Sequence, residues 1–294
     1  MSEQETPPVV GVIGGSGVYD IEGLANARWV TVETPFGAPS DQLLQGRLDG
    51  VQVVFLPRHG RGHRIPPSRL NSRANIHALK QLGVTEIISL SAVGSLTAAL
   101  PPGTFVLADQ FIDRTFAREK SFFDTGLVAH VSMAEPTCGR LGHTLARATE
   151  AADIPFQQGG VYLTMEGPQF STKAESSLYR SWGCDIIGMT NMPEAKLARE
   201  AEMCYAVVGM VTDYDCWHDE HENVSVEQVI AVLKANAEKA RTLVKGVLTD
   251  LAQRQSLCER GCHRALDTAI VTPPEARDPE LVGKLQTIAG RVLG

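Results

Sequence analysis

Residues 9–17 read VVGVIGGSG, an apolar run that ends in a glycine-rich turn. Such a run is typical of a strand covered on both faces of a sheet, and glycines directly after it leave the backbone open to a ligand. The pattern returns at residues 51–60, VQVVFLPRHG, and at residues 86–95, EIISLSAVGS. These three segments predict a sheet of buried strands that end in turns able to bind a ligand.

Further strands and helices alternate along the rest of the chain. Apolar runs predict additional strands over 104–108, 161–164, 185–187 and 205–211. Apolar residues at helical spacing predict helices over 69–82, 193–202 and 226–251, the last after a capping box of Ser225 and Gln228. This alternation predicts an α/β fold: a single domain with a central mixed, mostly parallel twisted sheet flanked by helices.

The chain changes character after Ala252. We expect residues 1–250 to form the domain and residues 251–294 to form a C-terminal extension packed on it. The six cysteines are scattered, which is typical of reduced, buried thiols rather than a disulfide framework. Cys258 and Cys262 lie in the extension with no further ligand near them in the sequence, so we expect no metal site there. Packing or an oligomer interface is favoured for this pair, and a redox pair is the alternative.

Composition excludes some classes of protein. The 27 Lys and Arg against 34 Asp and Glu give a net charge of 27 − 34 = −7, which argues against a protein that grips a nucleic-acid backbone. Apolar runs stay well below the roughly 20 residues of a transmembrane helix, and the N-terminus lacks the pattern of a signal peptide. We therefore expect a cytoplasmic globular protein with no membrane or nucleic-acid partner.

The residues in the turns after the first three strands indicate that an anionic ligand binds there. The first resembles a dinucleotide fingerprint, but it lacks the third glycine in register, and the second strand ends in Arg58 and His59 rather than in a ribose-binding acid. Arginine grips phosphate through two parallel hydrogen bonds, and Ser16, Ser91 and the small Ala92 offer hydroxyls or open backbone. Together the three turns predict a phosphate site at one edge of the sheet.

Two later strands are followed by side chains for which the sequence allows two alternative roles. Glu166 is a candidate general base or hydroxyl binder, and Phe170 either packs in the core or stacks on a flat ligand. Thr190, after the strand at 185–187, is either a ligand hydroxyl or part of a helix start.

The strand at 205–211 ends in VTDYDCW, with Asp213 and Asp215 two residues apart. In extended backbone their side chains point to the same face, where like charges raise one pKa. A carboxyl group with a raised pKa can protonate a leaving group. The alternative is a pair of solvated loop acids.

The chain resembles the trimeric purine nucleoside phosphorylase family, and within it the members that act on 5′-methylthioadenosine. The shared segments are IGGSG at 13–17, TPFG at 34–37, RHG at 58–60, QFIDRT at 110–115, MAEP at 133–136, EGP at 166–168, NMPE at 191–194 and TDYDCW at 212–217. They span about residues 9 to 250 in one order. The resemblance implies phosphorolysis of methylthioadenosine to adenine and 5-methylthioribose 1-phosphate, in purine and methionine salvage.

The resemblance also implies roles for individual residues. They are phosphate binding by Ser16, Arg58, His59, Ser91, Ala92 and Thr190; ribose and purine contacts by Met189 and Phe170; proton donation to N7 and acceptance from the 6-amino group by Asp213 and Asp215; and a 5′-methylthio pocket of His130, Val226, Val229 and Ile230. His130 would come from a neighbouring subunit of a homotrimer or homohexamer. No metal or organic cofactor is implied, because inorganic phosphate is the co-substrate.

Three alternatives remain open at this point. A phosphorylase for 6-oxopurines is disfavoured because carboxylates opposite O6 would repel it. A hydrolytic nucleosidase is disfavoured by Arg58 and His59. A nucleotide-binding or dehydrogenase-like protein would bind a nicotinamide cofactor and release no free base.

Overall fold

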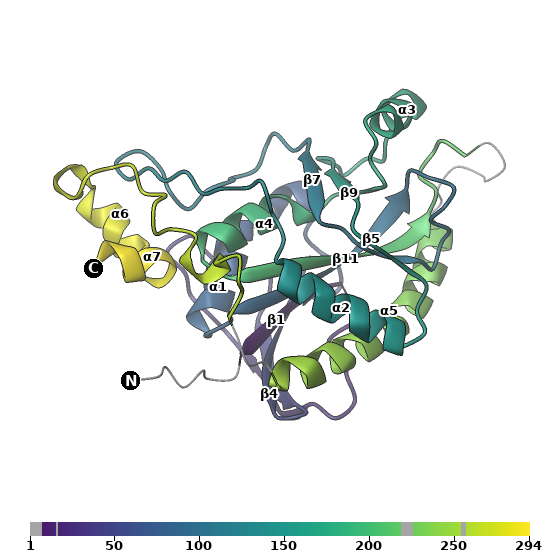
Figure 1. The fold of residues 1–294 in the computed structure, drawn as a ribbon, viewed down its shortest axis with the longest axis horizontal. Helices are drawn as coiled ribbons and strands as arrows, with labels where there is room; N and C mark the ends of the chain where they lie inside the picture. Colours follow the sequence, from purple (N-terminus) through teal and green to yellow (C-terminus); the bar gives the residue numbers. More distant parts are fainter. Residues whose placement is uncertain (1–7, 16, 219–225, 254–256) are drawn as a thin grey trace.

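The computed structural model describes residues 8–15, 17–218, 226–253 and 257–294, and for residues 226–231 the backbone alone (Figure 1). The strands are β1 (Val9–Gly14), β2 (Ala25–Val30), β3 (Leu43–Leu48), β4 (Val51–Pro57), β5 (Glu86–Ser95), β6 (Phe105–Leu107), β7 (Gln110–Asp113), β8 (Phe156–Gln158), β9 (Val161–Thr164), β10 (Ile186–Gly188) and β11 (Cys204–Asp213). The helices are α1 (Ser72–Gln81), α2 (Gly139–Ala151), α3 (Lys173–Ser181), α4 (Asn191–Glu200), α5 (Val226–Ala252), α6 (Pro279–Lys284) and α7 (Gln286–Leu293).

The strands form one mixed sheet around β5. Its order is β2-β3-β4-β1-β5-β10-β9-β7, and β11 pairs with β5 and with β6, which pairs with β8. Strand β1 is parallel to β4 and β5, and β5 is parallel to β11, whereas β2, β3 and β4 are joined antiparallel. The carboxyl ends of β1, β4, β5 and β11 therefore lie along one edge, which is where ligand sites form in sheets of this kind.

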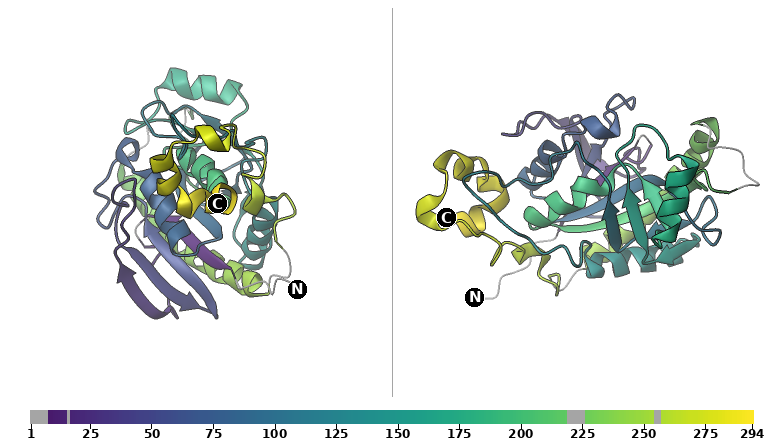
Figure 2. Two further views of the ribbon diagram at one scale, coloured as in Figure 1. Left: turned by 90° about the vertical axis from the view of Figure 1, so that its left-hand side faces the viewer. Right: turned by 90° about the horizontal axis from the view of Figure 1, so that it is seen from above.

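Helices cover both faces of the sheet (Figures 1 and 2). In β1, Ile13 packs in a cluster with side chains of α1, α4 and α7, while Val10 and Val12 pack in a second cluster with α2 and α5. This alternation follows from the two-residue period of a strand. Both clusters are apolar, so β1 is buried on each side, as its unbroken apolar run predicts.

The predicted fold class is confirmed, as are the positions of the seven predicted strands and three predicted helices. Strand β5 runs to Ser95 and so includes Ser91 and Ala92 of the predicted turn, because these small residues continue to pair with β11 and then with β10. Ser225, half of the predicted capping box, lies outside the described residues. Glycine ends α1: Gly83 has φ +83°, a conformation that favours glycine, and its N–H bonds to the Lys80 carbonyl.

The segment after α5 returns to the rest of the chain at several points. Helix α7 contacts α1, and Arg291 Nη2 lies 2.5 Å from Glu202 Oε1. Ile270 forms a β-bridge with Ala129 in the long connection between β7 and α2. Figures 1 and 2 show α6 and α7, in yellow, at one end of the molecule.

One expectation about this segment is wrong. Cys258 and Cys262 do have further thiols beside them, because the fold brings Cys138 and Cys204 to the same place, with all four Sγ atoms within 4.8 Å of one another. Cys138 directly precedes α2 and Cys204 begins β11, so neither is near the pair in sequence.

Candidate active site

A buried ion pair joins the end of β4 to the start of α4. Arg58 Nε lies 2.5 Å from Glu194 Oε1, and Arg58 Nη2 lies 3.1 Å from Oε2. Arg58 also donates to the Leu90 carbonyl (2.8 Å) and to Ser89 Oγ (2.6 Å), both on β5. Burial opposes the charge of Arg58, but Glu194 outweighs it and raises the pKa of Arg58. The guanidinium is thus fixed at the carboxyl edge of the sheet.

Two more polar side chains bond to Glu194, and a third bonds to one of them. Its Oε2 accepts from Ser89 Oγ (2.9 Å) and from the Tyr205 hydroxyl (3.2 Å). Asn191 Nδ2 donates to the same Tyr205 hydroxyl (2.8 Å). Sequence reasoning assigned no role to Ser89 or Tyr205. The signal that could have found them is a polar side chain inside an apolar strand, which must have a partner when buried.

His59 is buried beside this network. Its Nδ1 lies 2.8 Å from the Ile65 carbonyl, and its ring stacks on His63 with centroids 4.2 Å apart. Because a carbonyl only accepts, Nδ1 carries the proton and Nε2 of the neutral ring has a free lone pair. Burial lowers the pKa of His59 to about 4, so the imidazole is neutral at physiological pH.

The hydroxyls of Ser91 and Thr190 meet although 99 residues separate them. Their oxygens are 3.0 Å apart, and Tyr162 OH is also 3.0 Å from Ser91 Oγ. Ser91 lies on β5 and Tyr162 on β9, and Thr190 follows the end of β10. Ala92, next on β5, is exposed, so the strand has open space beside it at this point. The predicted phosphate residues of β5 and β10 are therefore side by side.

The two predicted acids stand together at the end of β11. The N–H of Asp215 donates to Asp213 Oδ1 (2.8 Å), and the Thr212 hydroxyl lies 2.7 Å from Asp213 Oδ2. Both side chains lie against Gly94 of β5, because a Cβ there would be 2.9 Å from Asp213 Oδ1 and 3.4 Å from Asp215 Cβ. Trp217 anchors the loop by donating to the Ser95 carbonyl (2.7 Å).

The surroundings of these acids favour their neutral forms. Burial raises the pKa of Asp213. Burial also raises the pKa of Asp215, and the charge of Asp213 adds to it. The alternative of two solvated loop acids is wrong, since Asp215 is only 6 % exposed. A carboxyl group whose pKa is raised in this way can donate a proton to a leaving group.

Phe170 and Met189 flank a turn after β9. Phe170 is 50 % exposed, so the alternative that it packs in the core is wrong. Met189 packs on Gly167, where a Cβ would lie 2.5 Å from Met189 Sδ. Gly167 also has φ +69°, so both its conformation and this close approach require glycine.

Glu166 holds this turn in place. Its Oε2 accepts from the N–H groups of Phe116 (2.7 Å) and Ala117 (3.2 Å), and Oε1 lies 3.1 Å from Arg118 Nε. Burial opposes ionisation, but these donors outweigh it and lower the pKa of Glu166. Arg118 further donates to the Met189 carbonyl (2.7 Å). Glu166 is therefore a positioning residue of the turn, not a free base.

Other predicted residues are not joined to this group by the described contacts. His130 is exposed on the connection between β7 and α2, and its N–H donates to the Ala269 carbonyl (2.8 Å). Ser16 lies outside the described residues. Val226, Val229 and Ile230 fall in the first turns of α5, but their side chains also lie outside the described residues.

A family model for the phosphorylase superfamily matches residues 9–249, most of the chain. The chain belongs to the phosphorylase superfamily. The match includes every strand of the sheet and each segment that holds a candidate site residue. The phosphorylase superfamily model ends before the segment with Cys258 and Cys262.

Curated relatives in this superfamily cover the whole chain. An S-methyl-5′-thioadenosine phosphorylase of Rhodospirillum rubrum is 64% identical over 294 residues, 100% of both chains. One from Cereibacter sphaeroides is 61% identical and covers 97% of this chain and 98% of its own. The similarity therefore extends through the C-terminal segment.

Solved structures share the fold. A methylthioadenosine phosphorylase from an antarctic soil metagenomic library is similar with a TM-score of 0.90 and 48% identity, over 96% of this chain and 99% of that one. A methylthioadenosine phosphorylase from Schistosoma mansoni in complex with adenine has a TM-score of 0.80 and 39% identity, over 84% and 93%.

Proposed function

We propose that the chain catalyses phosphorolysis of S-methyl-5′-thioadenosine to adenine and 5-methylthioribose 1-phosphate, a step of purine and methionine salvage. The observation that carries the proposal is the layout of β5. Ser91 touches Thr190 at one point of this strand, and Gly94 touches Asp213 and Asp215 three residues later. Three residues of strand span about 10 Å, enough for a ribose between phosphate and purine.

Phosphate is bound by Arg58, His59, Ser91, Thr190, the Ala92 backbone and Ser16. Arg58 has five N–H donors, and its described bonds to Glu194, Ser89 and Leu90 use four of them. The fifth is left for a phosphate oxygen. Glu194 fixes the guanidinium, so little entropy is lost when phosphate binds.

The purine lies between Phe170 and the two acids. As the C1′–N9 bond breaks, a phosphate oxygen attacks C1′ and Asp213 gives its proton to N7, which neutralises the charge on the leaving base. Asp215 accepts a hydrogen bond from the 6-amino group. Met189 contacts the ribose. Neither the attack on C1′ nor the proton transfer to N7 needs a metal or an organic cofactor. We therefore expect phosphate to be the co-substrate and no cofactor to be required.

The 5′-methylthio group enters a pocket of Val226, Val229 and Ile230, completed by His130 of a neighbouring subunit. A trimer or hexamer is supported by exposed apolar side chains close to His130: Val128 is 40 % and Val271 62 % exposed, and the Val271 N–H donates to the Val128 carbonyl. Exposed apolar residues grouped in this way are typical of protein interfaces. We propose residues 1–250 as the catalytic domain and 251–294 as its extension.

We further propose a cytoplasmic location, supported by six cysteines without a disulfide among the described residues. In the described part of the chain, no helix has both the length and the apolarity to cross a membrane.

The test compares initial rates on methylthioadenosine, adenosine, methylthioinosine and inosine, with and without phosphate. We expect fast, phosphate-dependent release of adenine from methylthioadenosine. Equal rates without phosphate would indicate a nucleosidase, and preference for inosine would contradict the 6-aminopurine assignment.

A further inference from the structure

Four buried thiols from three parts of the chain meet at the start of β11. Cys138 precedes α2, Cys204 begins β11, and Cys258 and Cys262 follow α5. Cys258 Sγ is 3.4 Å from Cys138 Sγ and 3.4 Å from Cys262 Sγ, and all four sulfurs lie within 4.8 Å of one another. The active-site residues make no use of this cluster.

The spacing of the sulfurs fits a tetrahedral metal site. A zinc ion with Zn–S bonds of about 2.3 Å holds its four sulfurs about 3.8 Å apart, within the range found here. A disulfide needs sulfurs about 2.05 Å apart, much closer than the 3.4 Å of either near pair. Two of the four ligands, Cys258 and Cys262, also have the short sequence spacing that zinc sites favour.

Positive groups lie beside the cluster. Zinc with four thiolates carries a net charge of 2 − 4 = −2, which is costly to bury without compensation. Arg199 Nη1 is 3.5 Å from Cys262 Sγ, and Arg140 Nη2 is 3.6 Å from Cys204 Sγ. Cys138 lies at the N-terminus of α2, where the helix dipole favours a thiolate. Arg140 also pairs with the buried Glu86 (2.6 Å), and Arg199 also donates to the Glu135 carbonyl, so both cations are held in place beside the cluster.

We propose that Cys138, Cys204, Cys258 and Cys262 bind one structural zinc ion that fastens the C-terminal segment to the domain. Binding releases the thiol protons and involves no redox change. All four ligands come from the protein, which leaves no open position for catalysis, so the role is structural. The site is independent of the proposed reaction.

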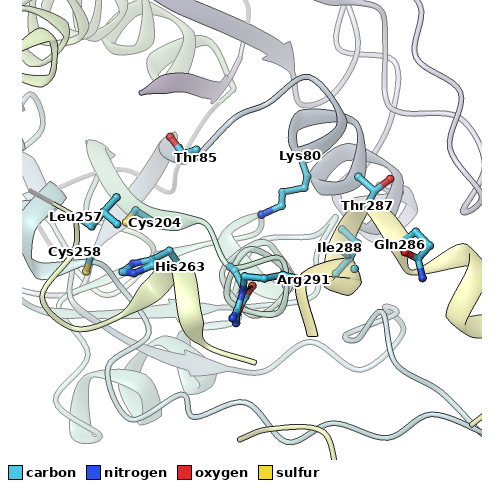
Figure 3. A pocket seen from close by; sticks show the side chains of 12 residues that line it. Lys80, Thr85, Cys204, Leu257, Cys258, His263, Gln286, Thr287, Ile288 and Arg291 are labelled. Atoms are coloured by element: carbon cyan, nitrogen blue, oxygen red, sulfur yellow. Dashed lines mark hydrogen bonds and ion pairs between the residues drawn. The ribbon is translucent and has the colours of Figure 1, made fainter. Parts of the chain in front are cut away.

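The position of the cluster shows what the metal would hold. Figure 3 shows Cys204, Cys258 and His263 at one end of a cavity whose other end is formed by α7 residues such as Gln286 and Thr287. The cavity lies between the loop of Cys258 and His263 and helix α7, so these two parts of the C-terminal segment do not pack against each other there. The C-terminal segment also contacts the connection between β7 and α2, because the Ala269 carbonyl accepts a hydrogen bond from the His130 N–H.

The first test measures zinc in the full chain purified under reducing conditions without chelator. We expect about one zinc per chain by elemental analysis, and loss of most of it in Cys258→Ser and Cys262→Ser. The control is Cys184→Ser, which removes a buried thiol outside the cluster and should keep the zinc. The cluster variants should also melt at lower temperature than the control.

A second measurement does not depend on whether the variants fold. Wild-type protein stripped of metal and reduced is titrated with cobalt without oxygen. We expect the visible absorption of tetrahedral thiolate-bound cobalt, lost on adding zinc. Absence of both zinc and cobalt binding would overturn the proposal, as would iron in place of zinc, or a mass lower by two or four hydrogens that indicates disulfides.

Discussion

The N–H of Asp215 donates a 2.8 Å hydrogen bond to Oδ1 of Asp213. Asp215 adopts φ +53° to make this bond, a backbone conformation that residues other than glycine seldom adopt. Because Oδ1 of Asp213 accepts this bond, the proton that Asp213 donates to the purine is carried by Oδ2, the oxygen beside Thr212. The two acids are therefore oriented differently, although they are close in sequence, and their roles can be tested separately.

Asp213→Asn should lower kcat for methylthioadenosine by about 100-fold or more, because the amide cannot protonate N7. It should also raise the relative activity on 6-oxopurine nucleosides. Since burial raises the pKa of Asp213, wild-type activity should extend toward neutral pH and fall as pH rises through that pKa. Asp215→Asn should mainly alter the choice of base. Unchanged kcat in Asp213→Asn would mean that another group is the acid.

Gly94→Ala should disturb the same acids from the neighbouring strand. The added Cβ would lie 2.9 Å from Asp213 Oδ1 and 3.2 Å from Ile187 Cγ2, so the carboxylate has to move. A displacement near 1 Å can cost about 100-fold in kcat. Gly142→Ala is the matched control, because a Cβ there meets no atom within 4 Å. Equal kcat in the two variants would contradict this role of Gly94.

His59 predicts a pH dependence of phosphate binding. Because the pKa of His59 is about 4, its ring is neutral and has a lone pair at Nε2. This lone pair would repel a phosphate oxygen, so the two atoms can form a hydrogen bond only if a proton lies between them. Bound phosphate should raise the pKa of His59, and phosphate should bind with proton uptake. KM for phosphate should then rise with pH, by up to about tenfold per unit.

The control for this prediction is His59→Asn, whose KM should follow only the titration of phosphate itself. Parallel pH profiles of KM in wild type and His59→Asn would show that His59 takes up no proton.

Glu194→Gln should destabilise the fold because it leaves Arg58 charged and buried without its partner. Loss of one partner of a buried pair costs about 3–5 kcal/mol in the free energy of unfolding. The control is Glu280→Gln, which removes an exposed pair with Lys284 and should leave the free energy of unfolding nearly unchanged. Denaturant unfolding measures both. A loss below about 1 kcal/mol in Glu194→Gln would contradict the role of the pair.

Much of this architecture is predictable from sequence, because the unbroken apolar runs of β1, β4, β5 and β11 require cover on both faces. The same logic places Arg58, Ser91 and Asp213 at one edge. It does not find the edge strand β2, which is mostly exposed and has no apolar run. It also misses α2, although Leu141, Leu145 and Ala148 lie at helical spacing, because only the two leucines among the buried residues of this helix are strongly apolar.

Contacts between distant segments are what the sequence leaves open. Arg58 and Glu194 are 136 residues apart, and the four thiols come from three separate segments. No local pattern predicts such a meeting, because it depends on how strands are ordered in the sheet. For Glu166 the residue type alone is misleading. It suggests a general base, but the carboxylate accepts hydrogen bonds from three donors in residues 116–118.

Phe170→Ala tests whether an exposed ring serves the ligand. Half of the Phe170 side chain is exposed, so its removal should change the free energy of unfolding by less than about 0.5 kcal/mol. Stacking of a base on an aromatic ring is worth about 1–3 kcal/mol, which corresponds to a fall in kcat/KM of about 5- to 150-fold. Phe170→Tyr keeps the ring and should stay near wild type. Loss of stability with unchanged kcat/KM would instead show that the ring serves packing.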